Sequence, residues 1–183
     1  MNIKSKKHSN EVIKMLNLNR VPENVFSVYN EQMITEFCLK NPSSMYILRD
    51  VENPSGNYYL CKTKEDCIIN AKNYTGAFSL GISCFAYTNI VLLGEIVLTK
   101  NDITIVATDD KTLNHRTVYQ NPIINKTTTI EDNSLFDIDG VELVINYLAE
   151  HNLYDVIVEF VVYDKPVGTN NDKVLIVELR SNY

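Results

Sequence analysis

Two glutamates near the C-terminus are the residues of this chain whose surroundings most clearly suggest chemistry. Glu159 stands in the run VIVEFVV and Glu178 in the run VLIVELR, so apolar residues flank both carboxylates. Taking a carboxylate out of water without a partner is costly, and each glutamate therefore needs a cation or hydrogen-bond donors nearby. The pair raises the question of which positive group it shares.

The segments that carry the two glutamates have the pattern of two β-strands joined by a polar turn. They cover residues 154–163 and 173–180, and β-branched and other apolar residues dominate both. If Tyr163 faces Val174 across the turn, antiparallel pairing places Glu159 opposite Glu178. Two directly opposed carboxylates repel each other, so we expect a cation between or beside them.

Three interpretations of this pair are open from the residues alone. In the first, the cation is Mg²⁺, a hard ion that one or two carboxylates and substrate phosphates hold in proteins. In the second, it is the guanidinium of Arg180, which shares a strand face with Glu178. In the third, the face meets solvent and both glutamates are ordinary surface residues. The apolar residues expected on the same face argue against the third: Ile157, Val161, Val174 and Ile176.

Hydrophobic periodicity and turn residues predict the elements that must position the pair. Helices are expected over 11–18, over 30–39 after the N-cap Asn30, from the capping box at 63–66 onward, and over 139–151 with Asp139 or a near neighbour as N-cap. Further strands are expected over 45–49, 58–61, 78–85, 90–99 and 103–108. Residues 109–137 show no periodicity and are predicted to form a long polar loop. This order predicts an α+β fold: a mostly antiparallel sheet with helices packed on one face.

Length and composition indicate one ordinary globular domain. The chain has 183 residues, of which 45% are hydrophobic and 22% charged. We expect a polar, loosely ordered N-terminal segment over 1–22 and a single α+β domain over 23–183. The four cysteines form no close pair of the kind found in zinc or redox motifs, and we expect reduced thiols packed in the core.

Charge and hydropathy exclude some partners. The formal net charge of −6 argues against a nucleic-acid groove, which is normally basic. No apolar run reaches the roughly 18 residues of a membrane span, and the basic start of the chain is not followed by the apolar core of a signal peptide. We therefore expect a cytoplasmic protein with neither a nucleic-acid nor a membrane partner.

The expected polar loop holds a second group of candidate residues, in the run DDKTLNHR. Arg116 could bind a carboxylate or phosphate with its two-pronged guanidinium, and His115 could act as an acid or base. The alternative is an ordinary solvated loop. The residues alone leave both interpretations open.

The C-terminal elements resemble those of the ATP-grasp superfamily. A helix over 141–151 leads into VIVEF and then into VLIVELRSNY, as the family's last helix leads into a strand with a metal-binding Glu and a strand ending in E-x-N. Glu159 and Glu178 fall where the family places its two Mg²⁺-binding glutamates. Arg180 stands at the place of the E-x-N asparagine, for which Asn182 is the possible substitute.

The resemblance extends upstream in the order of elements, over roughly residues 43–182. MYILRD, ENPSGN, YYLCK and TKEDCIINAKNY follow the family's order of a strand with a phosphate-binding cation, a glycine-rich loop, a strand and a helix. Arg49 then takes the place of the phosphate-binding cation, and Gly56 is the one glycine of the loop. The run IVLLGEIVL, with Gly94 and Glu95, is similar to the family's G-x-E-like element.

The resemblance implies a protein that binds ATP and Mg²⁺ as cofactors and joins a small carboxylate substrate to an amine or thiol through an acyl-phosphate. The implied metal ligands are Glu159, Glu178 and Asn182. The implied nucleotide contacts are Arg49, Gly56, Glu95 and Arg180, while Arg116 and His115 would orient the second substrate. The alternative is a non-catalytic binding or interaction module that keeps the fold. In it Glu159, Glu178 and Arg180 form an internal ion network, and a closing strand at a sheet edge could pair two copies into a homodimer.

Overall fold

The chain forms two compact units in a computed structural model that describes residues 2–3, 5–52, 57–110, 118–131 and 133–181. The smaller unit is Val21–Thr88, and the larger unit combines Met1–Arg20 with Asn89–Tyr183. This grouping differs from the sequence-based division into a segment of 1–22 and one domain of 23–183. The difference arises because the first twenty residues pack against the C-terminal strands.

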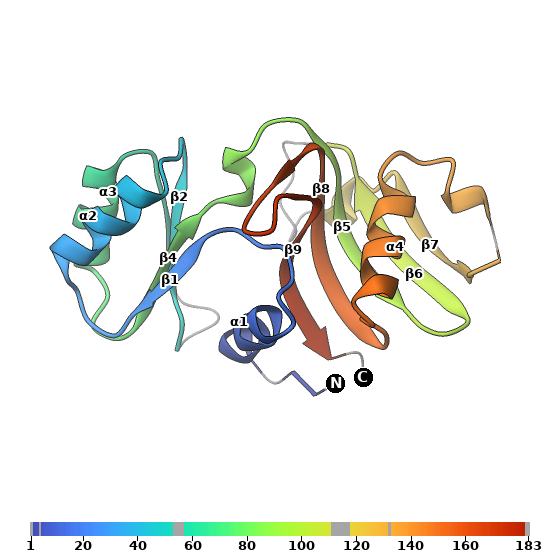
Figure 1. Cartoon of the computed structure of the whole chain (residues 1–183), viewed down its shortest axis with the longest axis horizontal. Coiled ribbons are helices and arrows are strands. Elements are labelled where there is room, and N and C mark those ends of the chain that lie inside the picture. Colours follow the sequence, from blue (N-terminus) through green and yellow to red (C-terminus); the bar gives the residue numbers. More distant parts are fainter. Residues whose placement is uncertain (1, 4, 53–56, 111–117, 132, 182–183) are drawn as a thin grey trace. The chain divides into compact units, whose positions relative to one another are not determined.

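The smaller unit is a four-stranded antiparallel sheet with two helices on one face (Figure 1). Its strands, in spatial order, are β1 (Glu23–Phe26), β4 (Phe78–Ile82), β2 (Tyr46–Asp50) and β3 (Tyr58–Cys61). Its helices are α2 (Glu31–Lys40) and α3 (Lys64–Ala71), and a 3₁₀ turn, η1 (Cys84–Ala86), follows β4. Leu48 and Leu80 of the sheet share a buried core with Ile34 and Phe37 of α2.

Both helices of the smaller unit begin at the predicted caps. The Asn30 side chain accepts a hydrogen bond of 3.0 Å from the backbone N–H of Met33. The Thr63 hydroxyl accepts from the N–H of Asp66, and the Asp66 carboxylate accepts from the N–H of Thr63. These bonds satisfy backbone donors that the first turn of a helix leaves free, which is why the local sequence predicted the two starts.

The larger unit is a five-stranded antiparallel sheet packed against helices. Its strands, in spatial order, are β7 (Ile124–Thr129), β6 (Asp102–Thr108), β5 (Ile90–Leu98), β8 (Val156–Val167) and β9 (Asp172–Ser181). Its helices are α1 (Lys6–Met15) and α4 (Val141–Glu150), with two 3₁₀ turns, η2 (Val118–Gln120) and η3 (Asn133–Leu135). Val12 of α1 and Val144 of α4 share one core with Ile96, Val158 and Leu179 of the sheet. The predicted α+β class, with antiparallel sheets and helices on one face, is confirmed.

The N-terminal residues close the edge of β9, the last strand of the five-stranded sheet. The Ser9 hydroxyl accepts a buried hydrogen bond of 2.8 Å from the N–H of Leu179. The backbone oxygen of Asn19 accepts from the N–H of Ile176 at 2.8 Å, and its side chain donates to the carbonyl of Val174 at 2.8 Å. The polar residues of this segment had predicted loose order. They instead form hydrogen bonds with backbone groups of an edge strand. Figure 1 shows α1 beside β9.

Two strands were not predicted. β1 is a four-residue strand, and β7 lies inside the expected loop of 109–137, so the prediction of a long loop without regular structure was wrong for Ile124–Thr129. An edge strand buries little: of β7 only Ile124 is fully buried, and the residues after it alternate between exposed and half-buried. Its threonines are β-branched and suit a strand, but they give no hydrophobic signal.

The start of α4 agrees with the prediction of an N-cap at Asp139 or a near neighbour. The N-cap is Gly140; its φ of 89° lies in the left-handed region, and no side chain caps the helix. A β-carbon on Gly140 would approach Leu92 within 3.3 Å, so the glycine also allows close packing on β5.

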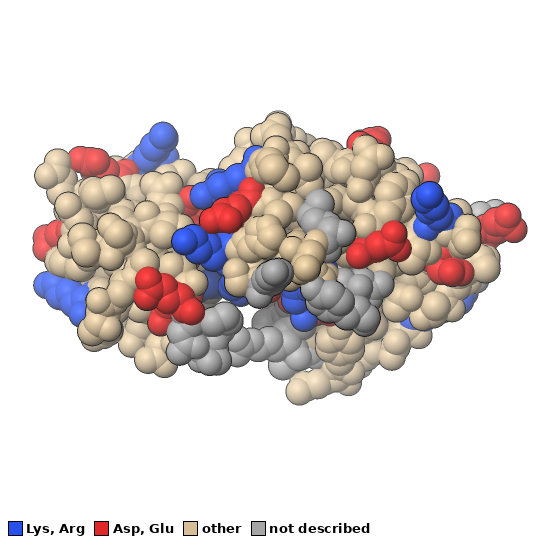
Figure 2. Space-filling view, turned by 90° about the horizontal axis from the view of Figure 1, so that it is seen from below, with Lys and Arg blue, Asp and Glu red and all other residues tan. Residues whose placement is uncertain are grey.

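Three further observations concern the helices, the surface and the thiols. None of the helices in the described ranges is long and apolar enough to cross a membrane. The face drawn in Figure 2 intersperses basic and acidic side chains among its described residues. All four cysteines are free and buried, as predicted.

Candidate functional site

Three glutamates form a row across neighbouring strands of the larger unit. Glu95 of β5 pairs with Glu159 of β8, and Glu159 pairs with Glu178 of β9. The residues next to them in sequence, such as Ile96 and Val158, lie in the core on the side of the helices. Because side chains alternate along a strand, the glutamates project from the other side of the sheet, which we call the carboxylate face.

The predicted opposition of Glu159 and Glu178 is confirmed, although the register assumed for it is not. Val162, and not Tyr163, faces Val174, and a bulge between Glu159 and Phe160 leaves Val177 as an extra residue on β9. The bulge corrects the offset and moves Glu178 to the carboxylate face. Val174 and Ile176 consequently lie in the core on the side of the helices, so the expectation that they share the face of Glu178 was wrong.

Each of the three carboxylates has a positive or hydrogen-bonding partner. The Nη2 atom of Arg180 forms a short ion pair with Glu95 and lies 3.5 Å from Oε1 of Glu159. The Nζ atom of Lys6, in the first turn of α1, lies 3.0 Å from Oε2 of Glu178. The hydroxyl of Tyr119 donates to the second oxygen of Glu95. The interpretation of ordinary surface glutamates is thereby weakened, because their side chains are only 14% to 16% exposed.

Burial shifts the acid–base properties of the group. Burial, reinforced by the facing Glu178 carboxylate, raises the pKa of Glu159 from its usual 4.5 to about 7, although Arg180 acts against this rise. Burial alone would lower the pKa of Arg180, but the three carboxylates outweigh it and raise that pKa. Burial and the bond to Glu95 raise the pKa of Tyr119 to about 12. Glu159 therefore changes charge near neutral pH.

The raised pKa of Glu159 makes stability depend on pH. The folded state retains a proton on Glu159 between about pH 4.5 and pH 7 that the unfolded state has released. The stabilisation of the folded state by this proton is complete below about pH 4.5 and is lost as the pH rises through about 7. We expect Glu159→Gln to remove roughly 2 kcal/mol of this pH dependence between pH 5 and pH 8, measured by urea unfolding at several pH values. The exposed Glu131→Gln is the control and should keep the wild-type slope, whereas an unchanged slope in Glu159→Gln would contradict the shift.

The row contains features that bear on a metal or phosphate ligand. In the described part of the chain, no group of three or more His, Cys, Asp or Glu side chains is arranged to hold a metal ion. Nε of Arg180 is buried and has no hydrogen-bond partner, although the side chain as a whole is 42% exposed. The arrangement fits a cation that arrives with an anionic ligand better than one held by the protein alone, since Mg²⁺ is usually bound through one or two carboxylates and substrate phosphates.

Arg49 belongs to the other unit. It pairs with Tyr58 and Ser79 on the sheet face opposite to that of Leu48, which points into the core. Its side chain therefore projects from the face of the sheet that α2 and α3 do not cover. The other predicted site residues, Gly56, His115, Arg116 and Asn182, lie outside the described residues. The binding and catalytic roles expected for all these residues stay predictions.

Sequence reasoning missed two members of the network, Lys6 and Tyr119. Lys6 comes from the opposite end of the chain and Tyr119 from the segment expected to be a loop. Only the three-dimensional path of the chain brings them to the glutamates. A hint was present in the run SKKHSNEVIKML, because Ser5 is a helix N-cap placed directly before Lys6.

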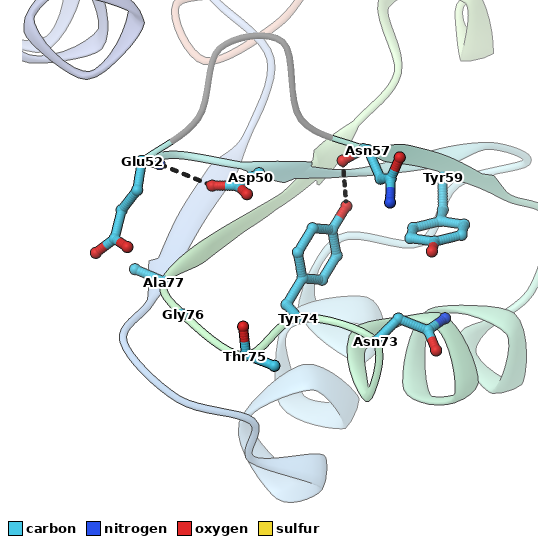
Figure 3. Close-up of a pocket in the computed structure, with 9 residues that line it drawn as sticks. All are labelled: Asp50, Glu52, Asn57, Tyr59, Asn73, Tyr74, Thr75, Gly76 and Ala77. Carbon is cyan, nitrogen blue, oxygen red and sulfur yellow. Dashed lines mark hydrogen bonds between the residues drawn. The ribbon is translucent and has the colours of Figure 1, made fainter.

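A hollow lies in the smaller unit, between the end of β2 and the loop that follows α3 (Figure 3). Its volume is about 310 Å³, and most of its lining side chains are polar. The lining residues are Asp50, Glu52, Asn57, Tyr59, Asn73, Tyr74, Thr75, Gly76 and Ala77. The hydroxyl of Tyr74 donates to the carbonyl of Asn57 at 2.9 Å, and Asp50 accepts from the N–H of Glu52 at 2.9 Å. Two carboxylates make this hollow a poor match for an anionic phosphate.

A similar fold occurs in a solved ligase, a solved synthase and a solved ATP-grasp protein. D-alanine–D-alanine ligase from Coxiella burnetii superposes with a TM-score of 0.53 at 15% identity, over 98% of this chain and 48% of that one. A RimK domain ATP-grasp protein from Sphaerobacter thermophilus gives 0.54 at 11% identity, over 98% of this chain and 58% of that one. N5-carboxyaminoimidazole synthase from Aspergillus clavatus, solved with ADP and 5-aminoimidazole ribonucleotide, gives 0.56 at 10% identity, over 97% and 44%.

These likenesses define the class of fold: the chain has an ATP-grasp-like fold, as its order of elements predicted. Identities this low carry the architecture and not the activity. The chain spans about half the length of the ligase and synthase structures it matches. No family model matches the sequence, and the comparison with curated proteins found no match.

Proposed function

We propose that this chain binds a magnesium–nucleotide complex on the carboxylate face, as part of an ATP-dependent ligase that joins a carboxylate to an amine or thiol. The observation that supports this most directly is the row of Glu95, Glu159 and Glu178 with Arg180 beside it. The ATP-grasp-like fold and its ligase neighbours support the same reading, among them the D-alanine–D-alanine ligase.

Glu159 and Glu178 are the proposed metal ligands. They are directly opposed. Burial and repulsion from Glu178 disfavour the charged form of Glu159, as its raised pKa indicates. A divalent cation would offset that repulsion. When bound, Mg²⁺ would neutralise phosphate charge and so ease the departure of the leaving group.

Arg180 is the proposed phosphate contact of the larger unit. Glu95 holds one end of its guanidinium, and Tyr119 in turn holds the carboxylate of Glu95. The group is thus oriented before a ligand arrives, and its side chain is 42% exposed, so a phosphate oxygen could accept a hydrogen bond from it. Arg49 keeps the role that the family resemblance implies for it. Gly56, Arg116, His115 and Asn182 keep the roles that the family resemblance implies for them.

A second candidate function is a non-catalytic interaction module with the same fold. The observation that favours it is that each of the three carboxylates already forms an ion pair, Glu178 with Lys6 and the other two with Arg180. A protein in which this network is only structural would bind no nucleotide. The two candidates therefore differ in one measurable property.

Thermal unfolding with and without Mg–ATP separates the two candidates. A ligand that binds only the folded state stabilises it, by about 2.7 kcal/mol at a hundred times its Kd. We expect Mg–ATP to raise the Tm of the wild-type chain and of Glu131→Gln, and to leave the Tm of Glu178→Gln unchanged. No rise for the wild-type chain with millimolar Mg–ATP would overturn the nucleotide proposal in favour of the interaction module.

A further inference from the structure

Lys6 forms an ion pair that no sequence motif indicated. Its ammonium lies 3.0 Å from the Glu178 carboxylate, and the two side chains are 30% and 16% exposed. Among the described residues, Glu178 forms its ion pair with Lys6, whereas Glu95 and Glu159 form theirs with Arg180. The N-terminal helix thus delivers the counter-ion of a proposed metal ligand.

The helix that carries Lys6 is firmly attached to the strand that carries Glu178. Ser9, one turn beyond Lys6, accepts from the N–H of Leu179 through a buried bond of 2.8 Å. Ile3, before the helix, donates from its N–H to the hydroxyl of Ser181 at 2.6 Å. Val12 and Ile13 anchor the apolar side of the helix in the core of the larger unit. The approach of Lys6 to Glu178 is therefore built into the packing of α1 on β9.

An ammonium and a divalent cation cannot share one carboxylate at close range without repulsion. Two positive groups a few ångströms apart interact unfavourably even at the moderate effective dielectric of a protein surface. Glu178 also faces Glu159, so the carboxylate that Lys6 occupies is the one where a bridging cation would sit. Lys6 must therefore move away before a metal ion gains the full benefit of Glu178.

We propose that Lys6 is a built-in competitor of the divalent cation at Glu178, so that the N-terminal helix sets the metal affinity of the carboxylate face. This inference rests on the proposed function in that it places the cation at Glu178. The lysine keeps Glu178 paired while no metal is bound. It lowers the affinity for the metal by the free energy needed to separate the ion pair. Release of α1 from β9 would raise that affinity.

Titration with Mn²⁺ alone, without nucleotide, tests the competition. Free Mn²⁺ is followed by electron paramagnetic resonance with the wild-type chain, Lys6→Met, Lys6→Arg and Lys7→Met. Lys7 is the matched control, because it is the neighbouring lysine on the same helix and is exposed. We expect Lys6→Met to bind Mn²⁺ at least about tenfold more tightly than the wild-type chain, because the repulsive ammonium is gone. Lys7→Met and Lys6→Arg, which keep a cation at position 6, should stay near the wild-type affinity.

The double variant Lys6→Met with Glu178→Gln locates the effect. It should lose the gain in Mn²⁺ affinity, because the contested carboxylate is absent. Equal or weaker Mn²⁺ binding by Lys6→Met would overturn the competition, as would a gain that persists in the double variant. Weaker Mg–ATP binding by Lys6→Met with unchanged Mn²⁺ binding would mean that Lys6 contacts phosphate instead. A gain in Mn²⁺ affinity without any Mg–ATP shift in the wild-type chain would uphold this inference while the nucleotide proposal fails.

Discussion

Replacement of Gly94 by alanine is expected to lower the free energy of unfolding by at least about 3 kcal/mol, which is at the upper end of the usual cost of overpacking. Gly94 pairs with Ala107 on one side and with Phe160 on the other, in the central strand of the five-stranded sheet. An added β-carbon would lie 2.7 Å from the Cα and 2.8 Å from the Cβ of Ala107, and closer still to the carbonyl oxygen of Val106. Backbone atoms cannot yield as a flexible side chain does, so strands β5 and β6 would have to separate.

Urea unfolding of Gly94→Ala measures this loss, and Gly81→Ala is the matched control. Gly81 also lies within a strand, but its added β-carbon would meet no atom nearer than 3.2 Å. The control should lose much less stability. Because Glu95 follows Gly94 directly, the variant is also expected to weaken the Mg–ATP thermal shift. A Gly94→Ala chain as stable as Gly81→Ala would show that β5 and β6 are not so closely packed.

Replacement of Arg180 by methionine is expected to lower the free energy of unfolding by about 3 kcal/mol at pH 8. Removing one partner of a buried ion pair typically costs 3–5 kcal/mol, and the 42% exposure of Arg180 argues for the lower end. Glu95 and Glu159, both nearly buried, would lose their shared counter-ion. The loss should be smaller at pH 5, because Glu159 has a pKa already raised to about 7 and can take up a proton instead.

Unfolding of Arg180→Met at pH 5 and pH 8 gives the comparison, with Lys173→Met as the control. Lys173 lies on the same strand and is exposed, so its replacement should change stability little at either pH. Arg180→Lys should recover part of the stability but not the oriented phosphate contact, since an ammonium lacks the planar fork. An equal loss at both pH values would mean that the guanidinium contributes by packing and not by charge.

The local sequence predicted those parts of the fold that local physics determines. The caps at Asn30 and Thr63 follow from hydrogen bonds within four residues, and strands β5, β6, β8 and β9 follow from runs of β-branched and apolar residues. The opposition of Glu159 and Glu178 was predicted from a register that is off by one near the turn. The pairing near the turn is shifted by one residue, and the extra residue Val177 in the bulge shifts it back before Glu178. Nothing in the sequence indicated this bulge.

The parts that were missed depend on contacts between distant segments. Lys6 reaches Glu178, and Tyr119 reaches Glu95, because α1 and η2 fold back onto the sheet. Neither residue belongs to a sequence motif that also contains one of the glutamates. Edge strand β7 was missed for a related reason, since it buries too little to leave a hydrophobic period.

The covering of β9 by the N-terminal residues has a consequence for association between copies of the chain. Ser9 and Asn19 already accept hydrogen bonds from the backbone N–H groups of Leu179 and Ile176. A neighbouring copy could therefore add a strand at β9 only after the N-terminal residues had been released from it.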